Sequence, residues 1–270
     1  MEEALETTKI HSVCGKLSGK TALVRDRPFR APHHTISDIA LVGGGSQPQP
    51  GEISLAHHGV LFLDELPEFK RTVLDVMRQP MEERKVSISR PRVAVDFPAS
   101  FMLVASMNPC PCGYYNHPER SCHCAPGQVQ QYLNRVSGPL LDRIDLHVEV
   151  TSVTYSDLSS TQTGETSTTI RERVMRARQI QQERFHRHPQ KNANATMQGK
   201  TIQQHCRLNE ASTKLLQVAM DKLNLSARAY DRIRKVARTI ADLEEKQNIE
   251  TQHVAEAIQY RSLDRENWSR

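Results

Sequence analysis

The sequence predicts an α/β domain followed by an all-helical domain. Two short apolar runs, Val60–Leu63 and residues 101–105, have the length and the β-branched or aromatic content of buried strands. Helical stretches such as residues 68–81 alternate with them, which favours a parallel sheet with covered faces. Beyond residue 169 the apolar residues recur only at helical spacing. The sheet therefore belongs to the first half of the chain, and the second half is expected to be helical throughout.

A change in composition separates the two predicted domains. Residues 1–150 form the α/β domain, and a third candidate strand over residues 146–150 ends it. Residues 151–169 are dense in Ser and Thr and almost without apolar side chains, which is typical of a linker or a surface loop. Residues 170–270 form the predicted helical domain.

Amphipathic helices account for the second domain. An Arg-rich helix is expected over residues 170–187, and two more over residues 210–223 and 227–245. A short last helix starts near Thr251, a residue type suited to an N-cap. The apolar face of the helix over residues 227–245 consists of Tyr230, Ile233, Val236, Ile240 and Leu243.

Composition limits the class of protein. No stretch approaches the roughly 18 apolar residues that a membrane span needs, and the acidic N-terminus has no apolar core of a secretory signal. We therefore expect a cytoplasmic protein without a membrane partner. Closely spaced cysteines in such a protein more often bind metal or remain thiols than form disulfides. The formal net charge of +5 permits an acidic partner such as nucleic acid but does not require one.

The strongest motif is an apolar strand that ends in two acids, Asp64 and Glu65. In open α/β sheets, ligands bind at the carboxyl ends of the strands, where these two carboxylates stand. In a Walker B strand the first acid helps to hold the Mg²⁺ that bridges the β- and γ-phosphates of ATP, and the second polarises the attacking water as a general base. Without its surroundings, the pattern also fits an ordinary buried strand followed by two solvated acids.

The surrounding segments resemble one protein family. Residues 50–59 lead into the Walker B strand with the Gly, Leu, Ala and Gly spacing of AAA+ proteins of the magnesium-chelatase and MCM-helicase branch, and residues 66–69 leave it in a similar way. Residues 27–37 and 138–147 also match. The resemblance covers nearly the whole chain and is to the ComM/YifB family of magnesium-chelatase-like ATPases. It implies an α/β AAA+ core with helices on both faces of a parallel sheet, incomplete at the N-terminus, followed by an all-helical lid domain.

The resemblance also implies a phosphate-binding loop, the Walker A motif, which this chain does not supply. Residues 15–21 end in Gly-Lys-Thr, but three residues rather than four separate the glycines, and no strand precedes them. We expect a helix-to-loop connection there instead. Family members carry the P-loop just upstream of the segment that matches residues 2–12. The chain is therefore expected to begin after the P-loop, to bind ATP weakly and, alone, not to hydrolyse it.

Three more functional residues follow from the resemblance. Asn108 comes after the second strand and matches sensor 1, which positions the attacking water. Arg143 lies in a segment similar to the one that carries the arginine finger, which a neighbouring subunit delivers to the phosphates. A finger implies a ring of copies, expected to be a hexamer. Arg228 matches sensor 2, through which the lid reaches the γ-phosphate and binds ATP, and Arg232 is the competing candidate.

A basic hairpin is predicted over residues 83–95, where polar and apolar side chains alternate at a period of two. In related helicases the matching hairpin points into the ring pore and touches DNA, and basic residues there neutralise phosphates without reading sequence. A solvated hairpin without a partner is the alternative. The four basic residues expected to flank the turn are Arg84, Lys85, Arg90 and Arg92.

Two C-x-C pairs suggest a metal site. Four thiolates at suitable reach can close a tetrahedral, structural Zn²⁺ site, although C-x₂-C is the usual spacing. A disulfide or four free thiols are the alternatives. The histidine pairs at residues 33–34 and 57–58 are not expected to chelate, since adjacent residues on a strand face opposite ways. The candidate zinc ligands are Cys110, Cys112, Cys122 and Cys124.

The resemblance implies a DNA-directed motor. It would be a hexameric ATPase that uses ATP and Mg²⁺ and migrates DNA branches during uptake and recombination of foreign DNA. The basic hairpin and the Arg-rich helix favour nucleic acid as the partner. A chelatase-type motor, which drives metal insertion or remodels proteins, is the alternative, and a non-catalytic assembly module is a third. Kinship of fold alone does not decide between them.

Overall fold

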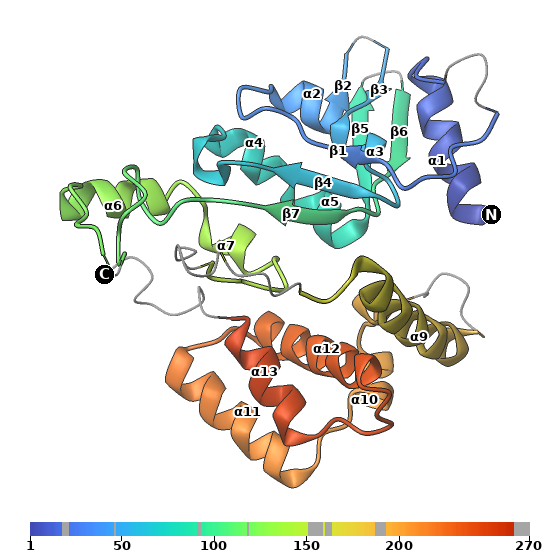
Figure 1. Ribbon diagram of the computed structural model, residues 1–270. Helices are drawn as coiled ribbons and strands as arrows, with labels where there is room; N and C mark the ends of the chain where they lie inside the picture. The colour runs from blue at the N-terminus through green and yellow to red at the C-terminus, as the bar shows by residue number, and fades with distance from the viewer. Residues whose placement is uncertain are drawn as a thin grey trace. The chain divides into compact units, whose positions relative to one another are not determined.

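The computed structural model describes residues 1–17, 22–45, 47–90, 93–117, 119–150, 159, 164–186 and 193–261. The chain divides into two compact units, Met1–Ile144 and a second unit from Asp145 onward (Figure 1). In the described part of the chain, no helix is long and apolar enough to cross a membrane.

A parallel three-stranded sheet lies at the centre of the first unit, in the order β1 (Phe29–Arg30), β4 (Val60–Leu63) and β7 (Met102–Ala105). The two apolar runs found in the sequence thus form neighbouring strands. Leu61 and Leu63 point into the core and are fully buried. The predicted class, a parallel sheet with helices followed by a helical region, is confirmed.

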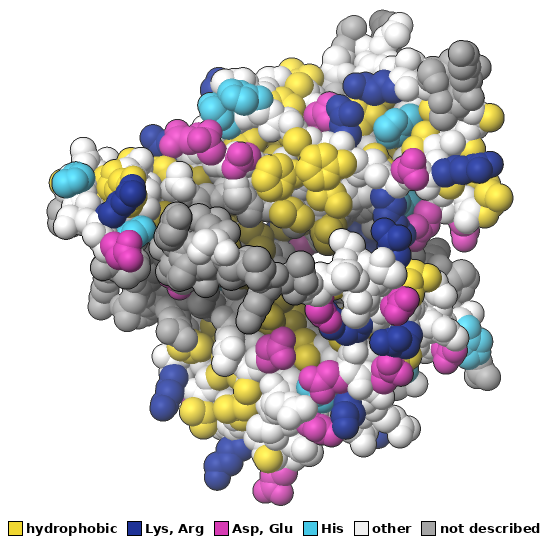
Figure 2. Space-filling view, in the orientation of Figure 1, with side chains coloured by type: hydrophobic (Ala, Val, Ile, Leu, Met, Phe, Trp, Pro, Cys, Tyr) yellow, Lys and Arg dark blue, Asp and Glu magenta, His cyan; other side chains and the backbone are white. Residues whose placement is uncertain are grey.

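The two faces of this sheet differ. Because side chains alternate along a strand, Phe29, Met102 and Val104 share the face opposite Leu61, and their exposed fractions are 63%, 59% and 38%. Figure 2 shows apolar side chains gathered over these strands. Helices were expected on both faces of the sheet; among the described residues, they cover one face only.

The helices of the first unit are mostly short. The helix predicted over residues 68–81 is divided into a 3₁₀ turn, α4 and α5. Proline explains the division, since Pro80 has no N–H to donate to the carbonyl of Val76, where α4 ends. The helical elements of the first unit are α1 (Glu2–Val13), α2 (Asp38–Val42), α3 (Glu52–Leu55), η1 (Leu66–Glu68), α4 (Arg71–Val76), α5 (Arg78–Glu83), α6 (Pro126–Leu133) and α7 (Gly138–Leu141).

Two antiparallel pairs complete the unit. The strands β2 (Gly43–Gly44) and β3 (Gln49–Pro50) form one pair. The other is the predicted hairpin, made of β5 (Lys85–Arg90) and β6 (Val93–Pro98). Its second strand runs three residues beyond the predicted end at residue 95.

Gly59 shows why the turn before β4 needs glycine. A Cβ built on Gly59 would lie 1.9 Å from the carbonyl oxygen of Pro28, far inside contact distance. The same close approach lets the N–H of Val60 donate to that oxygen at 2.8 Å, while the N–H of Met102 donates to the carbonyl of Gly59 at 2.9 Å. The glycine therefore allows three strands to begin side by side.

The second unit is helical, as predicted. Its elements are α9 (Ser167–Phe185), η2 (Asn194–Thr196), α10 (Lys200–His205), α11 (Glu210–Leu223), α12 (Ala227–Leu243) and α13 (Thr251–Gln259). Side chains of Thr166, Asn209 and Ser226 cap α9, α11 and α12. The cap of α13 is Glu250 rather than Thr251.

The core of the second unit lies between α9, α11, α12 and α13. Helix α12 contributes four buried side chains to this core: Ile233, Ala237, Ile240 and Ala241. Tyr230, predicted on the same face, is 37% exposed.

The strand predicted over residues 146–150 is wrong. These residues form no ladder in the described chain. Exposed and buried side chains do alternate here, but the apolar ones are on the exposed side. Leu146, Val148 and Val150 are exposed, and His147 is buried. The N–H of His147 donates to the carbonyl of Tyr260 at 2.7 Å, so a single contact replaces strand pairing. Residues 151–158 and 160–163 of the predicted linker lie outside the described residues, as do residues 18–21 of the rejected P-loop.

Candidate functional site

Acidic and polar side chains meet at the carboxyl edge of the three-stranded sheet. Asp64 and Glu65 follow β4 directly, and Ser106 follows β7. The hydroxyl of Ser106 donates to Oδ1 of Asp64, and the N–H of Glu65 donates to the same oxygen at 3.0 Å. Both carboxylates are exposed. The edge thus presents two acids to solvent, the first of them held in a fixed orientation.

Glu65 has a strained backbone. Its φ and ψ are 54° and 48°, in the left-handed region that residues other than glycine rarely adopt. The next residue is anchored, because the N–H of Leu66 donates to the carbonyl of Ser106 at 2.9 Å. Strain of this kind persists where neighbouring structure fixes it and is concentrated at functional sites. It turns the chain sharply after β4 and leaves the Glu65 carboxylate at the edge.

The loop after β1 brings a histidine to the same edge. Nδ1 of His34 lies 3.4 Å from Oε2 of Glu65. The carboxyl ends of all three parallel strands therefore contribute to one site, as expected for an open α/β sheet. The rings of His33 and His34 lie 4.0 Å apart, so the pair does not face opposite ways.

Asn108 is exposed and lies three residues beyond β7. The hydroxyl of Tyr132 of α6, a side chain that is almost fully buried, lies close to the main chain of Asn108. Burial raises the pKa of Tyr132, which keeps the phenol neutral. The sensor role of Asn108 stays a prediction; the residue follows β7, the strand paired with β4, which Asp64 follows.

Arg143 is engaged within its own unit. One guanidinium nitrogen lies 2.8 Å from a carboxylate oxygen of Glu82, and another donates to the carbonyl of Pro139 at 2.6 Å. The side chain is only 10% exposed. An arginine finger must extend from the surface, so Arg143 would have to exchange Glu82 for a phosphate. No local pattern in the sequence indicates this ion pair.

The two candidates for sensor 2 differ in their surroundings. Arg228 lies in the first turn of α12 and is exposed. Arg232 is paired with Asp145 and is mostly buried. This contrast favours Arg228, whose role toward nucleotide stays a prediction.

The basic residues of the hairpin divide into two groups. Lys85 pairs across the ladder with Pro98, and Arg90 with Val93, so Arg84 and Lys85 lie at the base of the hairpin rather than beside its turn. Their predicted position is therefore wrong.

The charge at the base is also partly satisfied. Nζ of Lys85 lies 2.7 Å from Asp96, and this pair raises the pKa of the lysine and lowers that of the acid. The side chain of Arg90 and all of Arg92 lie outside the described residues.

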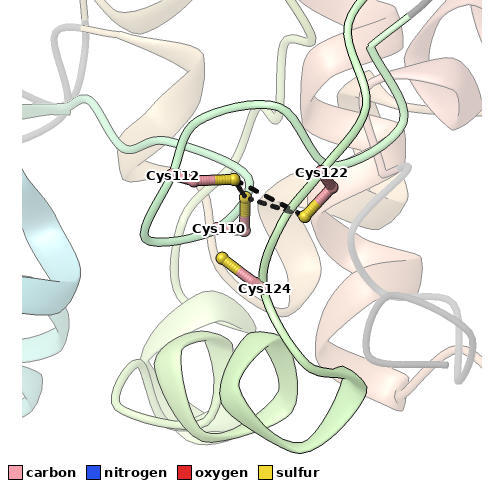
Figure 3. A group of neighbouring side chains, drawn as sticks. All are labelled: Cys110, Cys112, Cys122 and Cys124. Atoms are coloured by element: carbon pink, nitrogen blue, oxygen red, sulfur yellow. Dashed lines mark hydrogen bonds between the residues drawn. The ribbon is translucent and has the colours of Figure 1, made fainter.

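The four predicted zinc ligands converge. Their sulfurs all lie within 4.8 Å of one another, and those of Cys110, Cys112 and Cys122 are separated by 3.4, 3.5 and 3.7 Å (Figure 3). None is in a disulfide. Backbone hydrogen bonds from Tyr114 and His123 lower the pKa of Cys112 to about 6. The cluster has the ligand type and the spacing to hold a zinc ion.

A second cluster was not predicted. His57 and His58 both contact Oε2 of Glu6, at 3.2 and 2.7 Å, with their rings 3.9 Å apart. The expectation that such a pair faces opposite ways is wrong, because His58 has a φ of 56° in a turn rather than a strand.

Hydrogen bonds define the role of this second cluster. The N–H of Ser100 donates to Nδ1 of His57, so the neutral ring carries its proton on Nε2 and donates it to Glu6. This tautomer leaves no lone pair of His57 for a cation. We interpret the cluster as a tie between α1 and the turn before β4.

Comparison with known families covers both units. The model of "Magnesium chelatase, subunit ChlI" matches residues 1–158. The model of "Magnesium chelatase, subunit ChlI C-terminal" matches residues 164–261. The two matches together include the sheet, the cysteine cluster and the helical unit.

Several curated proteins are similar along nearly the whole chain. Competence protein ComM of Haemophilus influenzae is 49% identical over 265 residues, which are 97% of this chain and 50% of that protein. YifB of Escherichia coli is 47% identical over 267 residues, 98% of this chain and 51% of that protein. A protein of Mycobacterium tuberculosis, Rv2897c, is 40% identical over 260 residues, 96% of this chain and 51% of that protein. The chain spans about half the length of the curated relatives it matches.

Proposed function

This chain belongs to the family of magnesium chelatase subunit ChlI, an AAA+ family related to ComM, and we propose on that basis that it forms part of an ATP-driven motor that acts on DNA. The observation that supports the ATPase part is that Asp64 and Glu65 follow β4 directly, and Asn108 follows β7, its parallel neighbour, by three residues. Ligands of such sheets bind at this edge.

Each residue at the edge has a proposed task. Asp64, oriented by Ser106, would help to hold the Mg²⁺ that ATP brings. Glu65 would accept a proton from the attacking water, and the nearby His34 would help to orient its carboxylate. Asn108 would position the same water through its amide. The exposure of both acids suits a hydrated cation, which keeps several waters when it binds.

Three further parts complete the proposed motor. The P-loop is not among the motifs of this chain, and we propose that Arg143 reaches the phosphates of a neighbouring copy in a ring, six-membered by family resemblance. Arg228 would contact the γ-phosphate from the helical unit. ATP and Mg²⁺ are the proposed cofactors, a structural zinc ion is a third component, and the proposed location is the cytoplasm.

DNA is the proposed substrate of the motor. The relative from Haemophilus influenzae is named a competence protein, which fits a role in uptake and recombination, with branch migration as the activity. The hairpin β5–β6 supports this through the basic residues near its two ends, while Asp96 offsets the charge of Lys85 at the base. We propose that Arg90 and Arg92, next to the turn, make the phosphate contacts, and that Arg84 and Lys85 support them from the base.

ATP hydrolysis tests the catalytic assignment. The chain would be joined to a segment that carries a P-loop and assayed with and without branched and single-stranded DNA. Asp64→Asn should lower turnover by about 10²-fold or more, because the carboxylate that holds Mg²⁺ is lost. Glu65→Gln should lower turnover similarly but leave ATP binding in place. The control is Asp221→Asn, an exposed acid of the second unit; equal effects of all three would contradict the assignment.

DNA binding tests the hairpin with two variants of equal charge. Arg90→Gln with Arg92→Gln should weaken binding and reduce the salt dependence of the affinity by about one unit of slope per lost phosphate contact. Arg84→Gln with Lys85→Gln removes the same charge at the base and should have the smaller effect. Equal losses of DNA affinity in the two double variants would mean that the hairpin contributes only general positive charge. ATP hydrolysis that is indifferent to DNA would favour the chelatase-type motor instead.

A further inference from the structure

We propose that Cys110, Cys112, Cys122 and Cys124 form a structural zinc site that clamps the chain after β7 to α6 and so fixes the position of Asn108. The metal site stands on its own geometry. Only the task of Asn108 rests on the proposed ATPase function.

The sulfur positions match a tetrathiolate site. With Zn–S bonds of about 2.3 Å, a regular tetrahedron has S···S edges of about 3.8 Å. The sulfurs of Cys110, Cys112 and Cys122 are separated by 3.4, 3.5 and 3.7 Å, and the sulfur of Cys124 lies within 4.8 Å of the others. Figure 3 shows the four side chains pointing toward one common centre. Disulfide sulfurs would lie about 2.05 Å apart, so the arrangement is that of four ligands around an ion.

The local backbone explains how the unusual C-x-C spacing works. The N–H of Gly113 donates to the carbonyl of Cys110 at 3.0 Å and closes a tight turn around Cys112. Gly113 has a φ of 81°, a conformation that glycine adopts without strain. This turn brings the sulfurs of Cys110 and Cys112 to the same side. Since four protein ligands fill a tetrahedral zinc, no position remains for a substrate, and the site is structural.

The place of the cluster in the chain gives its task. Cys110 comes two residues after Asn108, and Cys124 directly precedes Ala125, the N-cap of α6. The metal would therefore join the segment directly after Asn108 to the first turn of α6. Loss of the metal would release α6 and remove the anchor beside Asn108.

Metal binding by the purified chain tests the site without ATP or DNA. We expect one zinc per chain, and Co²⁺ in its place should give the visible absorption of a tetrahedral tetrathiolate complex. Single Cys→Ser variants at the four positions should weaken binding by more than the roughly 10–100-fold typical of outer-shell changes. Cys14→Ser, outside the cluster, should bind as the unchanged protein does. Loss of metal in the control as well, or retention in all variants, would overturn the site.

Hydrogen exchange tests the clamp. Removing zinc with a chelator from the unchanged protein should speed amide exchange over residues 106–133, and returning zinc should restore protection. Zinc bound with no change in protection would refute the clamp and leave the metal site standing. Because neither experiment involves nucleotide, their failure is distinct from a failure of the motor proposal.

Discussion

Two sets of acidic side chains, one in each unit, lie in opposite surroundings. In the first unit, Asp64 and Glu65 stand exposed at a sheet edge. In the second, Asp242 is fully buried and receives hydrogen bonds from Arg184 at 2.5 and 2.6 Å, from Asn194 at 2.7 Å and from Arg238 at 3.0 Å. Arg238 in turn donates to two carbonyls of the α12–α13 loop.

The difference separates ligand-binding acids from structural ones. A buried carboxylate is tolerated only when charged and polar partners surround it, and Asp242 has three. A carboxylate that binds a cation must be reachable from solvent. In the described part of the chain, only Oδ1 of Asp64 accepts hydrogen bonds, so Oδ2 stays available. Burial together with complete pairing therefore indicates stability in the helical unit, and exposure with orientation indicates function in the sheet unit.

The same substitution in both units should give the largest contrast. Asp242→Asn keeps the shape of the side chain but leaves two buried guanidinium groups without a carboxylate. We expect the free energy of unfolding of the helical unit to fall by about 3–5 kcal/mol. Asp64→Asn, at an exposed position, should change stability by no more than about 0.5 kcal/mol. Urea denaturation of both variants measures this, and similar losses would break the distinction.

A smaller effect is expected where the sheet unit depends on close packing. Gly59→Ala places a methyl group against the carbonyl of Pro28, so the first unit should lose about 1–3 kcal/mol as the strands shift apart. Gly127→Ala is the matched control, because its Cβ would meet nothing within 4 Å and alanine favours the helix. Hydrogen exchange of β4 and β7 would locate the loss. Stability equal to that of the control would show that the approach of Pro28 to Gly59 is not required.

The smallest effect is a pH dependence confined to the first unit. Burial lowers the pKa of His57 below its ordinary 6.5, so the unfolded chain binds the proton more readily. The sheet unit should therefore be most stable above pH 6.5 and weaken as the pH falls below it.

The titration of Glu6 adds a second change in stability, at lower pH. The hydrogen bond from His58 lowers its pKa below the ordinary 4.5, so the stabilisation it gives is present above pH 4.5 and is lost in stronger acid. His57→Asn should reduce the loss of stability that occurs as the pH falls below 6.5. Thermal unfolding of both proteins across this pH range measures the difference. An unchanged profile in the variant would assign the step to another group.

Local sequence signals predicted much of the fold. The strands Val60–Leu63 and Met102–Ala105, the hairpin and the helices of the second unit follow from apolar runs and periodicity. Such patterns are written in adjacent residues. The strand predicted over residues 146–150 failed because alternation alone does not supply a pairing partner.

The sequence by itself determined which side chains are available for chemistry: two acids after a strand, four cysteines in two pairs, and arginines near a turn. Only the tertiary structure decided how each is used. Glu82 pairs with Arg143, and Ser106 orients Asp64. Glu6 contacts both His57 and His58. These partners lie far away in the chain, and packing of the core brings them together, so no local pattern could have revealed them.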